Sequence, residues 1–402
     1  MKQTFIVIML LFNIACAEEF QGRPPIQKGI HYPMGTAINI ADGQLYVVNS
    51  NFNLAYRSAS IVAVDLKTHR FTGKYVSFDS FPGDFMLVQP NGAPGLMGYV
   101  AIRGNNSLTW FKIDAEGDEV KLICNDSQSA PAACQGDYIV TEGVLEGEEA
   151  SVDEVEIGAD PFGLAFLPAF ADEPDIILLA SMKGGNVAGF TVDETGLPVL
   201  FDQIVVASGL HSVAADPFSR SFYVSNKSYP LLHRFGIQMD GDMPTLRKLD
   251  SISLPSPFST NEFGRGLAVA DNGRKLVLAY RTPSALMVVE GADASSDLAQ
   301  SANHVIAIGS RPGNVRVAPS GSNGQELAYV PCYGEDRLWV VDLESFVPVA
   351  IIETGAGPYD VATAFTDNIK RAYVSNFLDH TVSVIDIDPA SPFYHTSIAE
   401  IH

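Results

Sequence analysis

The chain has 402 residues, of which 47% are apolar and 18% charged, and this composition is that of a folded globular protein rather than a disordered one. It carries 47 acidic against 25 basic residues, a formal net charge of −22 at pH 7. Because so acidic a surface repels polyanions, the composition argues against DNA or RNA as a partner.

The N-terminus, MKQTFIVIMLLFNIACAEEF, has one basic residue, then an apolar run, then small residues, which is the layout of a secretory signal. We expect residues 1–17 to be a signal peptide and residues 18–34 a linker. Two processing routes fit: a bacterial lipobox that ends at Cys16, or ordinary cleavage after Ala17. We favour lipid on Cys16, because a cysteine after so short an apolar run is otherwise unexplained. The protein is then expected in the bacterial cell envelope, anchored to a membrane on its periplasmic or surface side, with plain secretion as the alternative.

Seven similar units follow, and each contains four short apolar runs separated by Asp, Asn, Gly or Pro. In the first unit the runs are GTAINIA, QLYVVNS, SIVAVDL and KYVSF, and in the last they are DVATAF, RAYVSNF, TVSVIDID and HTSIAEI. Runs rich in β-branched and aromatic residues, with turn residues between them, are typical of β-strands. The units begin at Gly35, Asp84, Phe162, Ser212, Gly266, Asn314 and Pro358, about 50 residues apart except at one insertion.

A repeat of this length without helical periodicity is typical of a propeller blade. One four-stranded sheet cannot bury both of its faces alone, whereas seven sheets set radially around an axis pack face to face. We therefore predict an all-β protein, a monomeric seven-bladed β-propeller of four-stranded antiparallel blades over residues 35–402. Small residues in the first strands, such as Gly163 and Ala165, suit the narrow inner end of each blade.

Residues 124–158 interrupt the repeat with an acidic stretch rich in turn residues. We expect a surface insertion, either a solvated excursion or a lid or partner-binding arm. Cys124 and Cys134 bracket its first loop at a spacing that suits a disulfide in an oxidising compartment. Cys332 ends a predicted strand and is expected to be a half-buried apolar side chain rather than a catalytic thiol.

The segments LYVVN, FYVSN and AYVSN, at residues 45–49, 222–226 and 372–376, resemble the YVTN-type β-propeller repeat, a WD40-like repeat. The Gly-x-x-Pro segments at residues 158–161 and 355–358 belong to the same pattern. The YVTN-type family is related in fold to bacterial lactonase-type seven-bladed propellers and to propeller domains of surface-layer proteins. The match is specific in units one, four and seven and degenerate elsewhere. The resemblance therefore implies the fold, and it suggests a lactonase-type activity only by analogy.

In a propeller, the loops between strands two and three and the loops between blades gather on one face around the central channel, where ligands usually bind. The polar residues expected there are Asp84, Arg103, Asn105, Lys183, His211, Asn226, Glu262, Arg265, Arg281, Arg311, Glu335, Arg337, Asp360 and Asn376. Guanidinium groups bind carboxylates and phosphates bidentately, so we expect a ligand at Arg103, Arg265, Arg281, Arg337 and Asn226. The alternative is that such residues tie neighbouring blades together.

Acid–base candidates at the same face are His211, Glu262 and Asp360. The chain contains no Gly-x-Ser-x-Gly elbow, no phosphate-binding Gly-rich Lys-Ser or Lys-Thr loop, no His-Glu-x-x-His and no Cys-x-x-Cys. Its eight histidines are scattered, so we expect no metal site and no cofactor, with calcium at Asp240-Gly241-Asp242 as the one alternative to a simple turn.

Two functions follow from these observations. The first is a non-enzymatic, exported and lipid-anchored propeller that binds a protein, a glycan or a small ligand at its loop face. The second is a lactonase-like hydrolase acting on a sugar-acid lactone, with the acid or base and the arginines named above. The two differ in geometry, because hydrolysis needs a carboxylate or imidazole within hydrogen-bond reach of a cleft that two arginines also line.

Overall fold

A computed structural model describes residues 22–116, 119–125, 132–146, 152–171, 173–241, 243–254, 262–291 and 302–402. The expected signal peptide lies outside these residues, so the lipidation of Cys16 stays a prediction. Within the described residues, no helix is long and apolar enough to cross a membrane.

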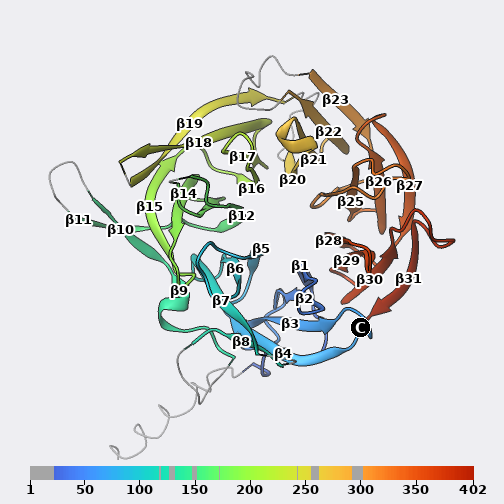
Figure 1. The fold of residues 1–402 in the computed structure, drawn as a ribbon, viewed down its shortest axis with the longest axis horizontal. Coiled ribbons are helices and arrows are strands. Elements are labelled where there is room, and N and C mark those ends of the chain that lie inside the picture. Colours follow the sequence, from blue (N-terminus) through green and yellow to red (C-terminus); the bar gives the residue numbers. More distant parts are fainter. Residues whose placement is uncertain are drawn as a thin grey trace, which may run out of the picture.

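Seven antiparallel sheets of four consecutive strands stand around a central axis, which confirms the predicted seven-bladed propeller (Figure 1). Blade 1 contains β1 Pro33–Asn39, β2 Gln44–Asn49, β3 Ala59–Asp65 and β4 Phe71–Phe78. Blade 2 contains β5 Pro82–Val88, β6 Leu96–Ile102, β7 Ser107–Glu116 and β8 Glu119–Ile123. Blade 3 contains β12 Pro161–Leu167, β13 Ile176–Ser181, β14 Asn186–Val192 and β15 Pro198–Val205. Blades 4 and 5 contain β16 Leu210–Asp216, β17 Ser221–Asn226, β18 Leu231–Asp240 and β19 Met243–Ser253; and β20 Gly264–Ala270, β21 Lys275–Tyr280, β22 Ala285–Glu290 and β23 Ala302–Ala307. Blades 6 and 7 contain β24 Arg316–Ala318, β25 Leu327–Cys332, β26 Arg337–Asp342 and β27 Val347–Glu353; and β28 Pro358–Phe365, β29 Lys370–Asn376, β30 Thr381–Asp386 and β31 Thr396–Ile401.

The core lies between neighbouring blades, and this explains the difference between middle and outer strands. All six residues of β2 and of β17 are buried, because both faces of a middle strand pack against side chains of adjacent blades. A middle strand therefore requires neighbouring apolar residues rather than an alternation of apolar and polar ones, as in the FYV of FYVSN. The outer strand β27 is exposed along most of its length, and its apolar side chains Val347, Val349 and Ile351 face solvent.

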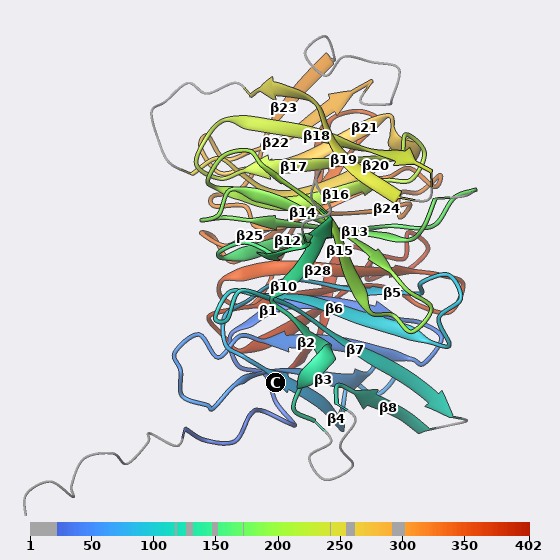
Figure 2. The ribbon, with the colours of Figure 1, turned by 90° about the vertical axis from the view of Figure 1, so that its left-hand side faces the viewer.

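The ring closes between two complete blades, with no strand exchanged between the ends of the chain. The first inner strand, β1, lies beside the last, β28, as the blue and red strands in Figures 1 and 2 show. Residues 22–32 add no strand to blade 7. Both the amide and the hydroxyl of Thr36 donate to the Asp360 carboxylate, at 2.7 and 3.0 Å. The amide of Tyr32 donates to Nδ1 of His380 at 2.9 Å.

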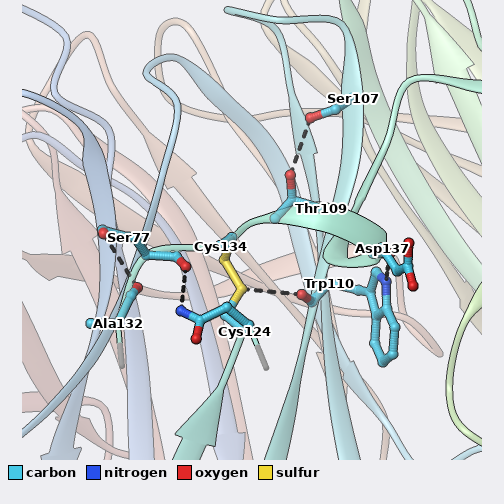
Figure 3. The surroundings of a disulfide bond; sticks show 10 residues. Ser77, Ser107, Thr109, Trp110, Cys124, Ala132, Cys134 and Asp137 are labelled. Carbon is cyan, nitrogen blue, oxygen red and sulfur yellow. Dashed lines mark hydrogen bonds between the residues drawn. A yellow bond between two sulfur atoms is a disulfide. The ribbon is translucent and has the colours of Figure 1, made fainter. Parts of the chain in front are cut away.

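The insertion is held to blade 2 by the predicted disulfide between Cys124 and Cys134, whose Cα atoms are 4.5 Å apart (Figure 3). Beyond it, Nε1 of Trp110 donates to the carbonyl of Asp137 at 2.7 Å, beside the short 3-10 helix η1 Gly136–Tyr138. The strand β9 Ile139–Val140 then pairs with β7. The hairpin of β10 Glu142–Glu146 and β11 Val152–Glu156 follows and projects from the outer edge of the ring in Figure 1, so it does not cover the channel.

Each inner strand begins with an irregularity at the same place. In six blades the register against the second strand shifts directly after the first paired residue, for example between Pro161 and Gly163 and between Pro358 and Asp360. In blade 6 an isolated bridge from Pro312 to Cys332 precedes β24. A β-bulge re-aims the side chains beside it. The two residues after this first paired residue are therefore the ones to examine along the channel.

Gly163 tests how tightly the inner strands pack. A Cβ added at Gly163 would lie inside van der Waals distance of the carbonyl oxygen of His211 in the next blade. Because backbone cannot yield as a side-chain tip can, we expect Gly163→Ala to lower the free energy of unfolding by about 1–3 kcal/mol in urea titrations. Gly35→Ala is the matched control, since its Cβ would meet only side-chain atoms, the nearest at 3.2 Å. Equal stability of the two variants would contradict this account.

Candidate functional site

The channel wall is built from the two residues that follow the first paired residue of each inner strand. In chain order these pairs are Met34 and Gly35, Gly83 and Asp84, Phe162 and Gly163, His211 and Ser212, Arg265 and Gly266, Gly313 and Asn314, and Tyr359 and Asp360. Nine of these fourteen residues line one narrow cavity on the axis, together with Arg281. The inner strands of blades 2 to 7 thus bring chemically different side chains to one level of the ring.

Three cavities follow one another through the ring. The mouth, of about 230 Å³, is lined by Met34, Phe52, Phe81, Arg103, Arg281, Arg311, Tyr333, Tyr359 and Phe377. The neck, of about 10 Å³, is lined by Asp84, Phe162, His211, Ser212, Arg265, Gly266, Arg281, Gly313, Asn314 and Tyr359. The lower chamber, of about 390 Å³, shares Asp84, Ser212 and Asn314 with the neck.

Arginines form one side of the mouth and neck. Nε of Arg103 pairs with Oδ1 of Asp160 at 2.5 Å, whereas Nε of Arg281 donates to the carbonyl of Pro312 at 3.2 Å. Burial lowers the pKa of Arg265 to about 10, with the positive charge of Arg281 adding to the effect, and burial also lowers the pKa of Arg281. Crowded guanidinium groups with few carboxylate partners favour an anion.

Glu262 is the acidic side chain that faces Arg265 and Arg281. Its carboxylate oxygens lie 3.8 Å from Nη2 of Arg265 and 3.9 Å from Nη1 of Arg281, longer than a hydrogen bond, and the side chain is 48% exposed. An ion pair this long and exposed contributes little to stability. A stronger anion can therefore compete with Glu262 for both arginines.

Aromatic rings form the other side of the mouth. The centroid of Phe377 lies 5.3 Å from that of Phe52 and 6.5 Å from that of Tyr333, and the Phe52 ring is 6.4 Å from Phe81. The guanidinium of Arg311 lies 5.4 Å from the ring centre of Tyr333, where the two sides meet. The mouth therefore suits a ligand with one anionic group and one apolar face.

Besides the two arginines, the neck holds three groups with displaced pKa values. Burial raises the pKa of Asp84 to about 7, against the opposing charge of Arg316. Asp84 keeps some accessible surface, but that surface faces the channel interior. Burial, reinforced by Arg265, lowers the pKa of His211 well below 6.5, and burial raises the pKa of Tyr359 to about 12. At neutral pH the neck thus presents a neutral imidazole and a protonated phenol.

His211 is only 6% exposed, and its ring lies 4.1 Å from that of Phe162. Its Nδ1 atom has no hydrogen-bond partner among the described residues. A buried polar atom without a partner costs free energy, and such atoms concentrate at functional sites.

Of the residues predicted from sequence, the structure brings Arg103, Arg265, Arg281, His211 and Glu262 together at the mouth and neck. The other three lie apart. Asp360 accepts hydrogen bonds from Thr36 and, at 2.7 Å, from Asn314, so both of its oxygens join blades 1, 6 and 7.

Asn226 is buried, donates to the carbonyl of Ser208 and accepts from the amides of Ser228 and Tyr229, which is a role within its own loops. Arg337 is exposed at the start of β26 and lines none of the three cavities.

Sequence reasoning missed the aromatic side of the mouth and the place of Phe162 and Tyr359 in the neck. A signal was present, because both residues directly follow the proline of a Gly-x-x-Pro segment. Cys332 is fully buried rather than half-buried, and burial raises the pKa of its thiol. Among the described residues, no group of three His, Cys, Asp or Glu side chains is placed to hold a metal.

Comparisons with known proteins support the fold. No family model matches the chain, and no curated protein matches its sequence. Among solved structures, hydrazine synthase of Kuenenia stuttgartiensis is 13% identical with a TM-score of 0.59, covering 92% of this chain and 99% of that one. The periplasmic gluconolactonase of Pseudomonas aeruginosa is 14% identical with a TM-score of 0.54, covering 82% and 87%. A putative 6-phosphogluconolactonase of Bacteroides fragilis is 12% identical with a TM-score of 0.52, covering 81% and 85%. At these identities the likeness shows the propeller fold, shared with lactonase-like propellers, and nothing about activity.

Asp84 gives a pH-dependent test of the neck. Because its pKa rises from 3.8 to about 7 on folding, the folded protein holds a proton that the unfolded chain releases between these values. The stabilisation is complete at low pH and is lost as the pH rises through 7. Asp84→Asn stays neutral, so its stability relative to the native protein should improve between pH 5 and pH 8 by up to about 3 kcal/mol.

Urea titrations at the two pH values measure this difference. Asp240→Asn, which alters an exposed carboxyl at a hairpin turn, is the matched control. A stability difference between Asp84→Asn and the native protein that is the same at both pH values would contradict the buried position of the carboxyl.

Proposed function

We propose that this protein is a lactonase-like hydrolase that opens a sugar-acid lactone at the mouth and neck of its channel. The observation that carries the proposal is the neck, where the imidazole of His211 and the carboxyl of Asp84 line the same small cavity as Arg265 and Arg281. This arrangement supports hydrolysis, because an imidazole and a carboxyl lie in a cleft that two arginines also line. The fold shared with gluconolactonase propellers supports the proposal only as analogy.

The mouth binds the substrate in this proposal. Arg103, Arg281 and Arg311 hold a second, anionic group of the lactone, such as the phosphate of gluconolactone 6-phosphate, because guanidinium donors match phosphate oxygens. The apolar C–H face of the sugar ring packs against Phe52 and Phe377. Together these contacts point the lactone carbonyl toward Arg265 in the neck.

The neck performs the chemistry. Its cavity of about 10 Å³ is near the least space that holds one water molecule. Neutral His211 takes a proton from this water as the water oxygen bonds to the carbonyl carbon, and Arg265 stabilises the oxyanion. When the ring C–O bond breaks, the leaving oxygen receives the proton of the His211 imidazolium, directly or by relay through the Tyr359 phenol, and the product is an open-chain hydroxy acid.

A second candidate is a binding module that holds an anionic small molecule, a glycan or an acidic protein segment at the same mouth without turning it over. The observation in its favour is the long contact between Glu262 and the two arginines. An anionic ligand can replace Glu262 there and bind without any reaction.

We test the proposal by titrating the acid released from δ-gluconolactone and from its 6-phosphate. Arg265→Gln and Arg281→Gln should each lower kcat/KM by about 10²–10³-fold, and His211→Asn by about 10²–10⁴-fold. The matched control is Arg337→Gln, which removes an exposed arginine away from the channel and should change kcat/KM by less than about twofold. If the native protein gives only the buffer rate while calorimetry detects binding of the hydroxy acid, the binding module replaces the hydrolase.

We also propose that the protein is exported and carries lipid on Cys16. The disulfide supports an oxidising compartment. Expression in a bacterial host with an alkyne analogue of palmitate should label the native protein, and Cys16→Ser should remove the label while secretion continues. Labelling that persists in Cys16→Ser would rule out a lipid at that residue.

A further inference from the structure

A tyrosine recurs at one position in the second strand of five blades, as Tyr46, Tyr99, Tyr223, Tyr329 and Tyr373. Four of these tyrosines have partners. The hydroxyl of Tyr46 donates to Asp42 at 2.6 Å, and that of Tyr99 donates to the carbonyl of Gly196 at 2.7 Å. The hydroxyl of Tyr329 is hydrogen-bonded to that of Ser320 at 2.6 Å, and Tyr223 also has a partner. The Tyr373 side chain is 1% exposed, and its hydroxyl has no partner among the described residues.

Tyr373 lies at the seam between blades 7 and 1, and the seam between blades 6 and 7 offers a close comparison. A histidine of the following blade meets the tyrosine edge-on at both seams, at 6.2 Å for Tyr329 with His395 and at 6.2 Å for Tyr373 with His69. Each histidine has a positive φ, 58° and 56°, and its amide donates to the aspartate that ends the preceding strand, at 2.8 Å in both cases. The two seams share one local geometry.

The seams differ in what fills the space next to this pair. Between blades 6 and 7, Ser320 bonds to Tyr329, and Tyr394 stacks on His395 at 3.7 Å and donates to the carbonyl of Ser320 at 2.8 Å. Between blades 7 and 1, Tyr373 and His69 instead line a pocket of about 540 Å³. This pocket is formed by the loops opposite the mouth, so it is separate from the channel.

The pocket is basic on a strongly acidic protein. Lys67, Lys370 and Arg371 line it, against Asp367 and Asp388. Asp388 is already paired with Lys370 at 3.1 Å. Arg371 is ion-paired through Nη1 with the buried carboxylate of Asp386 at 3.1 Å, which leaves its Nε and Nη2 atoms as further donors. Ammonium, guanidinium, imidazole and phenol donors therefore surround one space.

We infer that the seam between blades 7 and 1 is a binding site for a small molecule that carries an oxyanion, either a carboxylate or a phosphate. The ligand oxygen accepts from the Tyr373 hydroxyl, in the role that Ser320 has at the neighbouring seam. Lys67 neutralises its charge, and Nε and Nη2 of Arg371 donate further hydrogen bonds to it. A ligand held there bridges the first and the last blade, at the one junction in the ring that no peptide linker spans.

The test uses protein labelled with ¹⁵N-histidine and titrated with inorganic phosphate, succinate or citrate at constant ionic strength. At least one anion should shift the His69 ring resonances saturably, with assignment by His69→Gln. The dissociation constant should rise about tenfold in Lys67→Gln and severalfold in Tyr373→Phe, which deletes only the hydroxyl. Lys248→Gln, which removes an exposed charge from β19, is the matched control and should leave the titration unchanged.

The inference is overturned if none of the three anions moves His69, or if the response is the same in Lys67→Gln, Tyr373→Phe and the native protein. The His211 resonance reports separately on the channel. A response of His211 without one of His69 would leave the proposed hydrolase standing and remove the seam site. A response of His69 without one of His211 would support the seam site and leave the hydrolase to be decided by the lactone assay.

Discussion

The bulge at the start of each inner strand is the constraint on which the site depends. In a regular inner strand, successive side chains would point alternately toward the two neighbouring blades. The bulge places two consecutive residues per blade along the channel, and glycines such as Gly163 and Gly313 let the backbone of the next blade approach closely. His211 and Tyr359 are fixed by this packing, because their carbonyls are the atoms the glycines accommodate. Preorganisation of this kind is what a catalytic or binding constellation needs.

Charge is distributed unevenly over the molecule. With a net charge of −22, the outer surface repels anions at long range. In the mouth and in the seam pocket, by contrast, a few arginines and lysines supply most of the charged hydrogen-bond donors. Salt in the medium screens the distant acidic groups more than it screens partly buried guanidinium groups. Anions are thus kept from the general surface and concentrated where donors converge.

The fold followed from the sequence because periodicity and turn residues are local signals repeated seven times. The convergence of Arg103, Arg265 and Arg281 followed as well, since loop position on a propeller is fixed by strand count. The position of Arg337 did not follow: it is exposed at the start of β26 and lines none of the channel cavities, and the sequence does not indicate which way a side chain at a strand end points. Asp360 was expected to take part in chemistry, but the network with Thr36 and Asn314 depends on residues more than 40 positions away. The open seam at Tyr373 is visible only when blades are compared in three dimensions.

The ring is made of whole blades, since β1 to β4 and β28 to β31 each complete a sheet from one continuous segment. In a propeller whose first and last segments share one blade, removing a terminal repeat would split a sheet. Here each blade is one continuous segment, so a cut between blades falls in a loop. A gene encoding this architecture can therefore be rearranged in units of one blade, and a circular permutant that joins the present termini and opens elsewhere would keep every sheet intact.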